Sequence, residues 1–333
     1  MTSEKVGITV IICTYNGTER LLPTLSSIIN QEFQPSLFEL IVVNNASHDD
    51  TPEFCKQILS NAVFHWRIVE EPNLGLNHAR LKGLAEAKFD IVLFCDDDNS
   101  LSLDYLQIAF ELFKGNPRIG ALGGCGIPAF EGAKPEWFDR YSHSFAVGPQ
   151  ADRDGKILNQ PAELYGAGTF FRKKPLLDFF AAGFEAIMTD RKGNSLVSGG
   201  DVEYCYLIQL SGYEIWYDHR LTFTHFMPVG RMTWAYYLRL KEGITAGTAL
   251  LLPYTCLIGN NNFRLLQFCF SYISKMSLAT LLYIKHRSRN AFKARPLDDE
   301  SKLALAILRA RMASYWLNGL SSFTRFRDIK SLL

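Results

Sequence analysis

The sequence predicts an α/β fold, with a mostly parallel sheet covered by helices on both faces, and a helical basic region at the C-terminal end. The first observation behind this prediction is a set of four apolar, β-rich runs that alternate with segments of helical spacing. The second is charge. Residues 1–230 carry 19 Lys and Arg against 29 Asp and Glu, a net −10, whereas residues 231–333 carry 16 against 5, a net +11. We therefore expect a catalytic domain at 1–240 and a basic region at 241–333 that faces an anionic partner.

Composition limits the class of protein. The chain has 333 residues, of which 47% are hydrophobic, and this excludes disordered, collagen-like and small disulfide-stabilised proteins. Its seven cysteines show neither CxxC pairs nor metal-ligand spacing, so we interpret them as reduced residues in a cytosolic compartment. The N-terminal MTSEKVG lacks an apolar stretch, and we expect no signal peptide.

The first half of the chain predicts a βαβαβαβ unit. Its strands are expected at Val6–Cys13, Leu37–Val43, Val63–Val69 and Ile91–Cys95. Its helices, each with capping residues at its start, are expected at Thr18–Asn30, Asp49–Ser60 and Leu76–Ala87. Ligands of such sheets bind beyond the carboxyl ends of the strands, which directs attention to the residues that follow each run.

The pattern is less regular further along the chain. Residues Gly126–Gln160 contain several prolines and glycines and predict a long loop over the sheet. Leu164–Phe171 is expected to be a strand, in which Gly166 and Gly168 allow a close backbone approach. An amphipathic helix is expected at Val202–Leu210, with Asp201 as a candidate N-cap.

Polar side chains cluster at three of the predicted strand ends. They are Thr14-Tyr15-Asn16, Asn44-Asn45 and Asp96-Asp97-Asp98. Some neighbours, such as Ser47, Asp49 and Ser102, are equally expected to cap helices. Three adjacent carboxylates after a buried strand repel one another unless a cation neutralises them, and hard oxygen ligands favour Mn²⁺ or Mg²⁺. A solvated acidic turn is the alternative.

Seven blocks in order resemble the inverting family 2 glycosyltransferases of GT-A type, which have a Rossmann-like sheet. The blocks are VIICTYNGTERL, LIVVNNASHDDT, EPNLGLNHARLKGL, IVLFCDDDNSLSLDYL, GAGTFFRKKPL, GGDVEYCYLIQLSGYEIWY and THFMPVGR. Together they cover about residues 6 to 250. Each block alone is weak, and their order and spacing make the resemblance specific.

The resemblance implies roles for individual residues. Thr14, Tyr15, Asn16, Asn44 and Asn45 would hold the base and ribose of a nucleotide sugar. The block with Asn73, Gly75 and Arg80 would lie near the base or phosphates, where a guanidinium suits either. Asp96 and Asp98 match a DxD pair that serves ribose and metal, with Asp97 beside them as a further nucleotide-sugar residue. Asp201 would be the catalytic base that takes the proton of the acceptor hydroxyl.

The sequence departs from the family pattern at two positions. Asn44 stands where an Asp is usual, which weakens the choice of uracil as the base. Gly200 stands where a Glu usually precedes the catalytic Asp, so the acceptor side has one carboxylate fewer. Neither change removes the metal pair or the base.

Further residues have both a functional and a structural interpretation. His225 is a candidate metal ligand, and Arg231 in the same block a candidate phosphate contact. Gly166, Gly168, Gly200 and Trp137 are expected on the acceptor side. Trp216 is expected to face a sugar ring or to pack in the core.

The C-terminal region predicts helices with an apolar and a basic character. Gly243–Phe263 holds no charged residue and Leu265–Ile284 only Lys275, but Pro253 and several polar residues argue against membrane spans. The basic clusters at 285–289 and 293–295 and the spacing of Leu303–Trp316 suit a helix lying on an anionic leaflet. Packing on the catalytic domain or on a second subunit is an equal alternative.

The sequence thus predicts a cytoplasmic, metal-dependent inverting hexosyltransferase, peripheral on the membrane. It would move a sugar from a nucleotide diphosphate sugar, UDP-linked by expectation, to a saccharide or lipid-linked saccharide in surface polysaccharide biosynthesis. The alternative is a catalytically inactive scaffold of the same fold. A sugar-nucleotide nucleotidyltransferase would need a Gly-rich basic loop after the first strand, where the chain has Thr14–Gly17. No nucleic-acid partner is expected, because basic and aromatic residues do not interleave.

Overall fold

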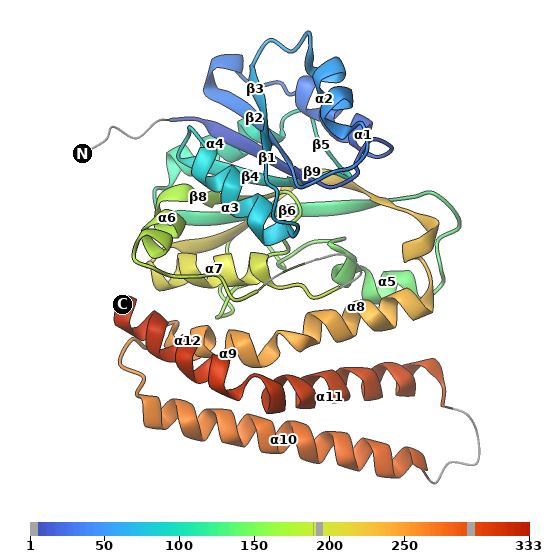
Figure 1. The fold of residues 1–333 in the computed structure, drawn as a ribbon, viewed down its shortest axis with the longest axis vertical. Helices are drawn as coiled ribbons and strands as arrows, with labels where there is room; N and C mark the ends of the chain where they lie inside the picture. Colours follow the sequence, from blue (N-terminus) through green and yellow to red (C-terminus); the bar gives the residue numbers. More distant parts are fainter. Residues whose placement is uncertain (1–5, 189, 191–195, 292–296) are drawn as a thin grey trace.

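The fold consists of a sheet with helices on both faces and a layer of C-terminal helices stacked beneath it (Figure 1). The computed structural model describes residues 6–188, 190, 196–291 and 297–333. The α10 helix is the outermost element of the C-terminal layer, with α11 and α12 between it and the α8 and α9 helices.

The strands form one nine-stranded sheet in the order β3-β2-β1-β4-β8-β6-β9-β5, with β7 beside β9. Their bounds are β1 (Ile8–Thr14), β2 (Phe38–Asn44), β3 (His65–Glu70), β4 (Ile91–Asp96), β5 (Asn99–Leu101), β6 (Ile119–Phe130), β7 (Gly155–Lys156), β8 (Thr169–Arg172) and β9 (Glu214–Met227). The four predicted strands are confirmed as β1 to β4, which run parallel to one another. The rest of the sheet is mixed, because β8 runs antiparallel to β4 and β6 while β6 and β9 are parallel.

Helices cover both faces of the sheet, as predicted. They are α1 (Leu21–Ile29), α2 (Thr51–Leu59), α3 (Leu76–Glu86), α4 (Tyr105–Gly115), α5 (Phe138–Tyr141), α6 (Lys173–Ala181), α7 (Gly200–Leu210), α8 (Trp234–Ala246), α9 (Thr248–Leu257), α10 (Leu265–Ala291), α11 (Asp299–Leu317) and α12 (Gly319–Leu332). One core packs α1, α2 and α4 on one face, and a second packs α3, α6, α7 and the C-terminal helices on the other. Strands buried on both faces are continuously apolar, which explains why β1 and β2 were readable in the sequence.

Several expected boundaries differ from the structure. The predicted loop at Gly126–Gln160 begins later, because β6 continues to Phe130 through glycines that hide its strand pattern. The predicted strand Leu164–Phe171 is reduced to β8, because Gly168 adopts a φ of +66° that strand backbone does not have. Asp201 is not the N-cap of α7, since Gly199 holds that position and Asp201 lies inside the first turn.

The predicted caps of the first helices are also partly wrong. The α1 helix starts at Leu21 rather than Thr18, and its N-cap residue Arg20 makes no capping side-chain bond. Asp49 instead ties two helix starts together. Its Oδ2 accepts from the Thr18 hydroxyl at 2.8 Å, and its Oδ1 accepts from the Thr51 amide at 3.2 Å.

The C-terminal helices are joined to the catalytic layer by buried polar contacts. Glu203 of α7 accepts a hydrogen bond from the Tyr254 hydroxyl of α9 and from the amides of Ile187 and Met188. Burial raises the pKa of Glu203, because a charged carboxylate is unfavourable in the core without such hydrogen-bond donors. The basic residues at 285–289 end the α10 helix, whereas those at 293–295 lie outside the described residues.

The sheet bends where β6 and β9 shift register between Gly123 and Cys125. A Cβ added to Gly124 would lie 2.0 Å from the Leu221 carbonyl oxygen, which is backbone and cannot move aside. We expect Gly124→Ala to lower the free energy of unfolding by roughly 1–3 kcal/mol through overpacking. Urea denaturation measures this change. The matched control is Gly115→Ala at the end of α4, where a Cβ meets nothing within 4 Å. A control that destabilised as much as Gly124→Ala would contradict the explanation.

Candidate active site

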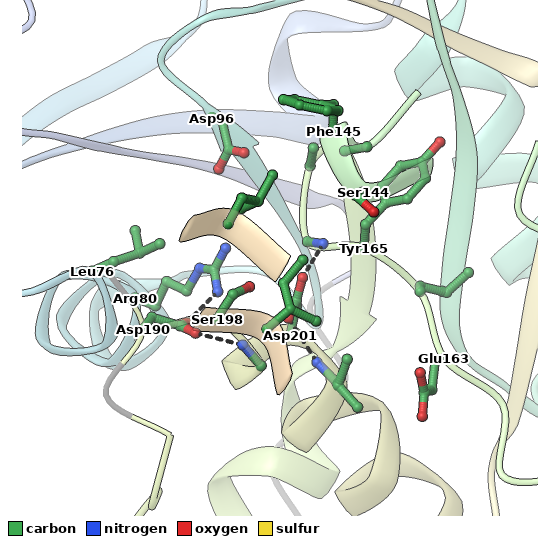
Figure 2. Close-up of a pocket in the computed structure, with 18 of the residues that line it drawn as sticks. Leu76, Arg80, Asp96, Ser144, Phe145, Glu163, Tyr165, Asp190, Ser198 and Asp201 are labelled. Carbon is green, nitrogen blue, oxygen red and sulfur yellow. Dashed lines mark hydrogen bonds and ion pairs between the residues drawn. The ribbon is translucent and has the colours of Figure 1, made fainter. Parts of the chain in front are cut away.

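A cavity of about 1050 Å³ lies between the carboxyl ends of β1 and β4, the start of α7 and the C-terminal helices. Figure 2 shows Arg80, Asp190 and Asp201 together on one side, with Asp96 nearby and Glu163 farther along. Most of the predicted site residues line this cavity. They are Thr14, Tyr15, Asn45, Gly75, Arg80, Asp96, Asp97, Asp98, Gly166, Asp201 and His225, with Arg231.

Asp97 is bound tightly within the protein. Its Oδ1 accepts from Arg20 Nε at 2.9 Å, and its Oδ2 accepts from Arg20 Nη2 and the Thr14 hydroxyl at 2.7 Å. Burial raises the pKa of Asp97, and Arg20 opposes that rise. This bidentate pair fixes the turn after β4 against the start of α1. Asp97 therefore supports the cavity wall through contacts that sequence reasoning did not foresee.

Asp98 and His225 form a pair at the metal position that the sequence predicts. The His225 Nε2 lies 3.5 Å from Asp98 Oδ1, and both side chains are buried. The His225 Nδ1 lies 2.9 Å from the Phe145 carbonyl, so a proton there leaves Nε2 as an acceptor. Metal-binding histidines usually have this arrangement, in which a backbone carbonyl orients the ring. The donor set therefore fits a divalent cation.

Two features qualify the fit of the metal position. Arg231 Nη1 donates to Asp98 Oδ2 at 2.8 Å, and it offers a cation for a phosphate as well. Asp96 faces the same cavity but is not gathered with Asp98 and His225 within 4.8 Å. Among the described residues, Asp154, Asp218 and His219 form such a group, but Asp218 is paired with Arg220 and none of the three lines this cavity.

Asp201 projects into the cavity from the first turn of α7. Its Oδ2 accepts from the Gly166 amide at 2.5 Å and its Oδ1 from the Val202 amide at 2.9 Å. A Cβ at Gly166 would lie 3.0 Å from the Asp201 Cβ, so glycine permits this close approach. Burial raises the pKa of Asp201, and the neighbouring Asp190 carboxylate raises it further. The raised pKa brings this carboxylate closer to the range in which a general base works well.

Asp190 is a functional candidate that sequence reasoning missed. Its Oδ2 accepts from Arg80 Nη1 at 2.9 Å, and its Oδ1 accepts from the Gly200 amide at 2.7 Å. A Cβ on Gly200 would lie 2.2 Å from Asp190 Oδ2, so the carboxylate occupies the space that a side chain at position 200 would need. Position 200 has no Glu side chain, and the Asp190 carboxylate from another segment lies in the space beside it. Nothing in the local sequence around Asp190 signals this contact.

Arg80 connects the predicted nucleotide block to this network. Burial would lower the pKa of Arg80, but the carboxylates of Asp190 and Asp201 raise it, so the guanidinium stays charged. It also lies over the Phe94 ring, 5.5 Å from its centre. A buried cation fixed in this way suits an anionic ligand.

Asn45 joins the end of β2 to the predicted Asn73–Arg80 block. Its Nδ2 donates to the Asn73 carbonyl at 2.7 Å, and its Oδ1 accepts from the Gly75 amide at 2.8 Å. Tyr15 is 38% exposed at the cavity edge and makes an edge-to-face contact with His48. The two strand ends therefore meet as the sequence predicts.

The other predicted residues lie outside the cavity lining. Asn16 accepts from the His48 amide, Asn44 is buried and donates to Glu70, and Asn73 contacts the cavity wall through Asn45. Gly168 packs against Tyr105, whose hydroxyl donates to its carbonyl at 2.5 Å. Trp137 stacks on Tyr237 in an aromatic cluster.

These placements revise the acceptor side that the sequence predicts. Of that set, Gly166 lies at the cavity, whereas Gly168 and Trp137 pack elsewhere and Gly200 makes room for Asp190. Trp216 also lies outside the lining, where its indole N–H donates to Glu214. Aromatic and small residues serve packing and binding alike, so their type alone did not distinguish these uses.

A family model described as "Glycosyl transferase family 2" matches residues 9–180, slightly more than half of the chain. The chain belongs to glycosyl transferase family 2. The strands β2 to β4, all of β1 except Ile8, and the carboxylates after β4 lie within the matched residues.

Curated relatives of this family 2 chain act on polysaccharide or lipid-linked sugars. A glucosyl-dolichyl phosphate glucuronosyltransferase of Haloferax volcanii is 24% identical over 221 residues, which are 66% of this chain and 68% of that protein. A poly-beta-1,6-N-acetyl-D-glucosamine synthase of Staphylococcus aureus is 31% identical over 121 residues, which are 36% of this chain and 29% of that synthase.

Solved structures show the same GT-A fold. S. aureus TarS 1–349 in complex with UDP-GlcNAc has a TM-score of 0.59 at 15% identity, covering 98% of this chain and 91% of that one. The mannosyltransferase PcManGT of Pyrobaculum calidifontis, in complex with GDP-Man and Mn²⁺, has a TM-score of 0.58 at 18% identity, covering 94% and 86%. The predicted family, fold and enzyme class are confirmed.

The Asp190 contact predicts a shift in the pH profile of this family 2 transferase. Asp190→Asn removes a negative charge that raises the pKa of Asp201. It also removes a carboxylate that shares the Arg80 cation with Asp201. Both effects lower the pKa of Asp201, so the acid limb of the kcat/KM profile should move to lower pH. The profile of sugar transfer between pH 4 and 9 measures this. Asp178→Asn, an exposed carboxylate on α6, is the control. An acid limb that stayed in place or moved to higher pH would contradict the expectation that Asp201 is the base of the reaction.

Proposed function

We propose that this chain is a metal-dependent, inverting transferase that moves a sugar from a nucleotide diphosphate sugar to a hydroxyl of a saccharide or lipid-linked saccharide. The observation that carries the proposal is the position of Asp201, which faces one cavity together with Asp96, Asp98 and His225. Asp96, Asp98 and His225 suit the metal and diphosphate of a nucleotide sugar, whereas Asp201 suits a proton transfer.

The donor end is assigned from its chemistry. Tyr15 offers a ring face at the cavity edge, and the turn fixed by Asn45 and Gly75 offers a rigid wall for a nucleoside. Asp98 and His225, with Asp96 lining the same cavity, would hold Mn²⁺ or Mg²⁺ beside a diphosphate. A bound ion there would neutralise charge on the departing diphosphate. Arg231, which is bonded to Asp98, would offer a second cation to the same phosphates.

Asp201 is proposed as the base. The acceptor oxygen forms a bond to the anomeric carbon while the bond from that carbon to the diphosphate oxygen breaks, and the leaving group takes the electron pair. The acceptor proton passes to an oxygen of Asp201. Backbone amides hold both carboxylate oxygens, so the group keeps one orientation and presents its remaining lone pairs to the cavity.

Replacing the proposed base should stop transfer without preventing donor binding. We expect Asp201→Asn to lower kcat by roughly a hundredfold to ten-thousandfold, which is the usual contribution of a general base. Release of nucleoside diphosphate from UDP-, GDP- and dTDP-sugars, with and without Mn²⁺ or Mg²⁺ and with membrane lipid extract as acceptor, measures this. Asp104→Asn, an exposed carboxylate at the start of α4, is the control.

Two results would contradict this proposal. Unchanged transfer by Asp201→Asn would contradict the proposal that Asp201 is the base. Transfer at full rate in the presence of a chelator would contradict the proposed metal dependence. Binding of sugar nucleotides by the wild type without any turnover would favour the alternative, a scaffold that keeps the fold. The dependence of turnover on metal, measured in the same assay, tests the proposal that Asp98 and His225 hold a divalent ion.

We also propose that α10 lies on an anionic membrane surface. It is 27 residues long, and its Leu265–Arg289 segment is long and apolar enough to cross a membrane by length and composition alone. Only 17% of its most apolar window is buried, and Leu266 and Phe270 are 72% and 75% exposed. Lys285, Arg287 and Arg289 follow at its end, and this combination suits a helix in the interfacial plane.

The membrane proposal predicts a loss of vesicle binding when the apolar face is made polar. Burying one large apolar side chain contributes about 1.5–3 kcal/mol, so Leu266→Ser with Phe270→Ser should weaken binding by tenfold or more. Cosedimentation with vesicles of phosphatidylcholine and phosphatidylglycerol measures this. Val63→Ser with Leu158→Ser removes two side chains that are 81% and 63% exposed on the catalytic layer, and should have no effect. Equal binding of both variants would contradict the proposal.

A further inference from the structure

The cavity has a second end that the donor and the base do not use. Beyond Asp201 it continues between the C-terminal helices, where its lining changes from carboxylates to cations and apolar side chains. The apolar part is supplied by Leu240 and Ile244 of α8 and by Leu251 and Leu252 of α9. The cations are Lys241 of α8, Lys275 of α10 and Arg311 of α11.

These three cations have no ion-pair partner within the described part of the chain. Lys241 makes a 3.4 Å contact with the Ser144 hydroxyl, which leaves its charge uncompensated. Some other basic residues of the same helices are paired, such as Arg309 with Glu242 and Lys302 with Asp299. Three cations without an ion pair thus line one cavity, with Lys241 half-buried and Lys275 and Arg311 exposed to solvent.

Lys241 and Arg311 also lie close enough to affect one another. Burial lowers the pKa of Lys241, and the charge of Arg311 lowers it further. Lys275 belongs to the same cavity wall, near Cys256 of α9. Like charges that face one cavity without a counterion repel, and an anion of the ligand removes that repulsion. A phosphate can accept hydrogen bonds from several such donors at once.

Resting on the proposed function, we infer that this second end binds the phosphate or diphosphate of a polyprenyl-linked acceptor through Lys241, Lys275 and Arg311. The acceptor hydroxyl then reaches Asp201 along the same cavity. The apolar wall contributed by α9 suits the first carbons of a lipid chain. Lys275 lies on α10, and the exposed Leu278 and Leu282 follow it three and seven residues later on the same helix face, so a lipid tail leaving the cavity meets an apolar surface there.

Binding of farnesyl diphosphate tests this inference while the donor end is filled. The protein is first saturated with Mn²⁺ and UDP or GDP, whichever binds, so that the probe cannot occupy the donor site. Calorimetric titration with farnesyl diphosphate should then show saturable binding that weakens with added salt. We expect Lys241→Gln with Arg311→Gln to weaken binding by roughly tenfold or more, since hydrogen bonds to charged groups are the strong ones.

Control measurements separate charge, lipid and structure. Arg327→Gln with Lys330→Gln removes two cations of α12 outside the cavity lining and should leave the affinity unchanged. Farnesol, which lacks the phosphate, should bind equally to the wild type and to the double variant. With lipid extract as acceptor, the Lys241 and Arg311 variant should show a raised KM for acceptor and an unchanged KM for the sugar nucleotide.

Four outcomes would overturn the inference, the last of them without affecting the proposed function. The first is equal affinity of farnesyl diphosphate for the wild type and the cavity variant. The second is binding of a poly(glycerol phosphate) oligomer in place of farnesyl diphosphate, which would replace the lipid by a soluble polymer. The third is failure of every nucleoside diphosphate to bind, which would remove the proposed function together with this inference. Normal nucleotide binding with phosphate-independent acceptor binding would remove this inference alone.

Discussion

The cavity depends on carboxylates that would repel one another without the arginines paired with them. Arg20 holds Asp97, Arg80 holds Asp190 and Arg231 holds Asp98, each through a contact of 2.7 to 2.9 Å. The arginines come from α1, α3 and the segment after β9. Each pair therefore joins a segment distant in sequence to the end of the sheet or to the start of α7.

The C-terminal helices complete this arrangement rather than standing apart from it. The buried Glu203 links α7 to Tyr254 of α9 and to the chain before Asp190. The helix that carries the proposed base is therefore held from the C-terminal side as well as from the sheet. One cavity passes from the strand ends to α10 and α11, which brings an acidic and a basic surface to its two ends. The opposite charges of the two regions of the sequence correspond to these ends.

Sequence reasoning succeeded where a pattern of residue types has one usual structural explanation, as an apolar run does in a buried strand. The runs of β1 to β4 were predicted within two residues at each end, and β1, β2 and β4 are buried and mostly apolar, as strands covered on both faces usually are. The strand-end positions of Asp96, Asp98 and Asn45 followed from the same pattern. It failed for Trp137 and Gly168, whose residue types serve packing as readily as binding, and for β6, whose glycines conceal its alternation.

The sequence by itself determined the family, the parallel half of the sheet, the acidic strand end and the division of charge along the chain. Only the tertiary structure decided which side chains meet. The Asp190 contact with Gly200, the Arg20 pair of Asp97 and the gathering of Lys241 with Arg311 join segments separated by a short stretch of sequence, by three strands or by two helices. The physical reason is that periodicity records the burial of a residue in its own element, whereas the partner of a charge is chosen by packing between elements.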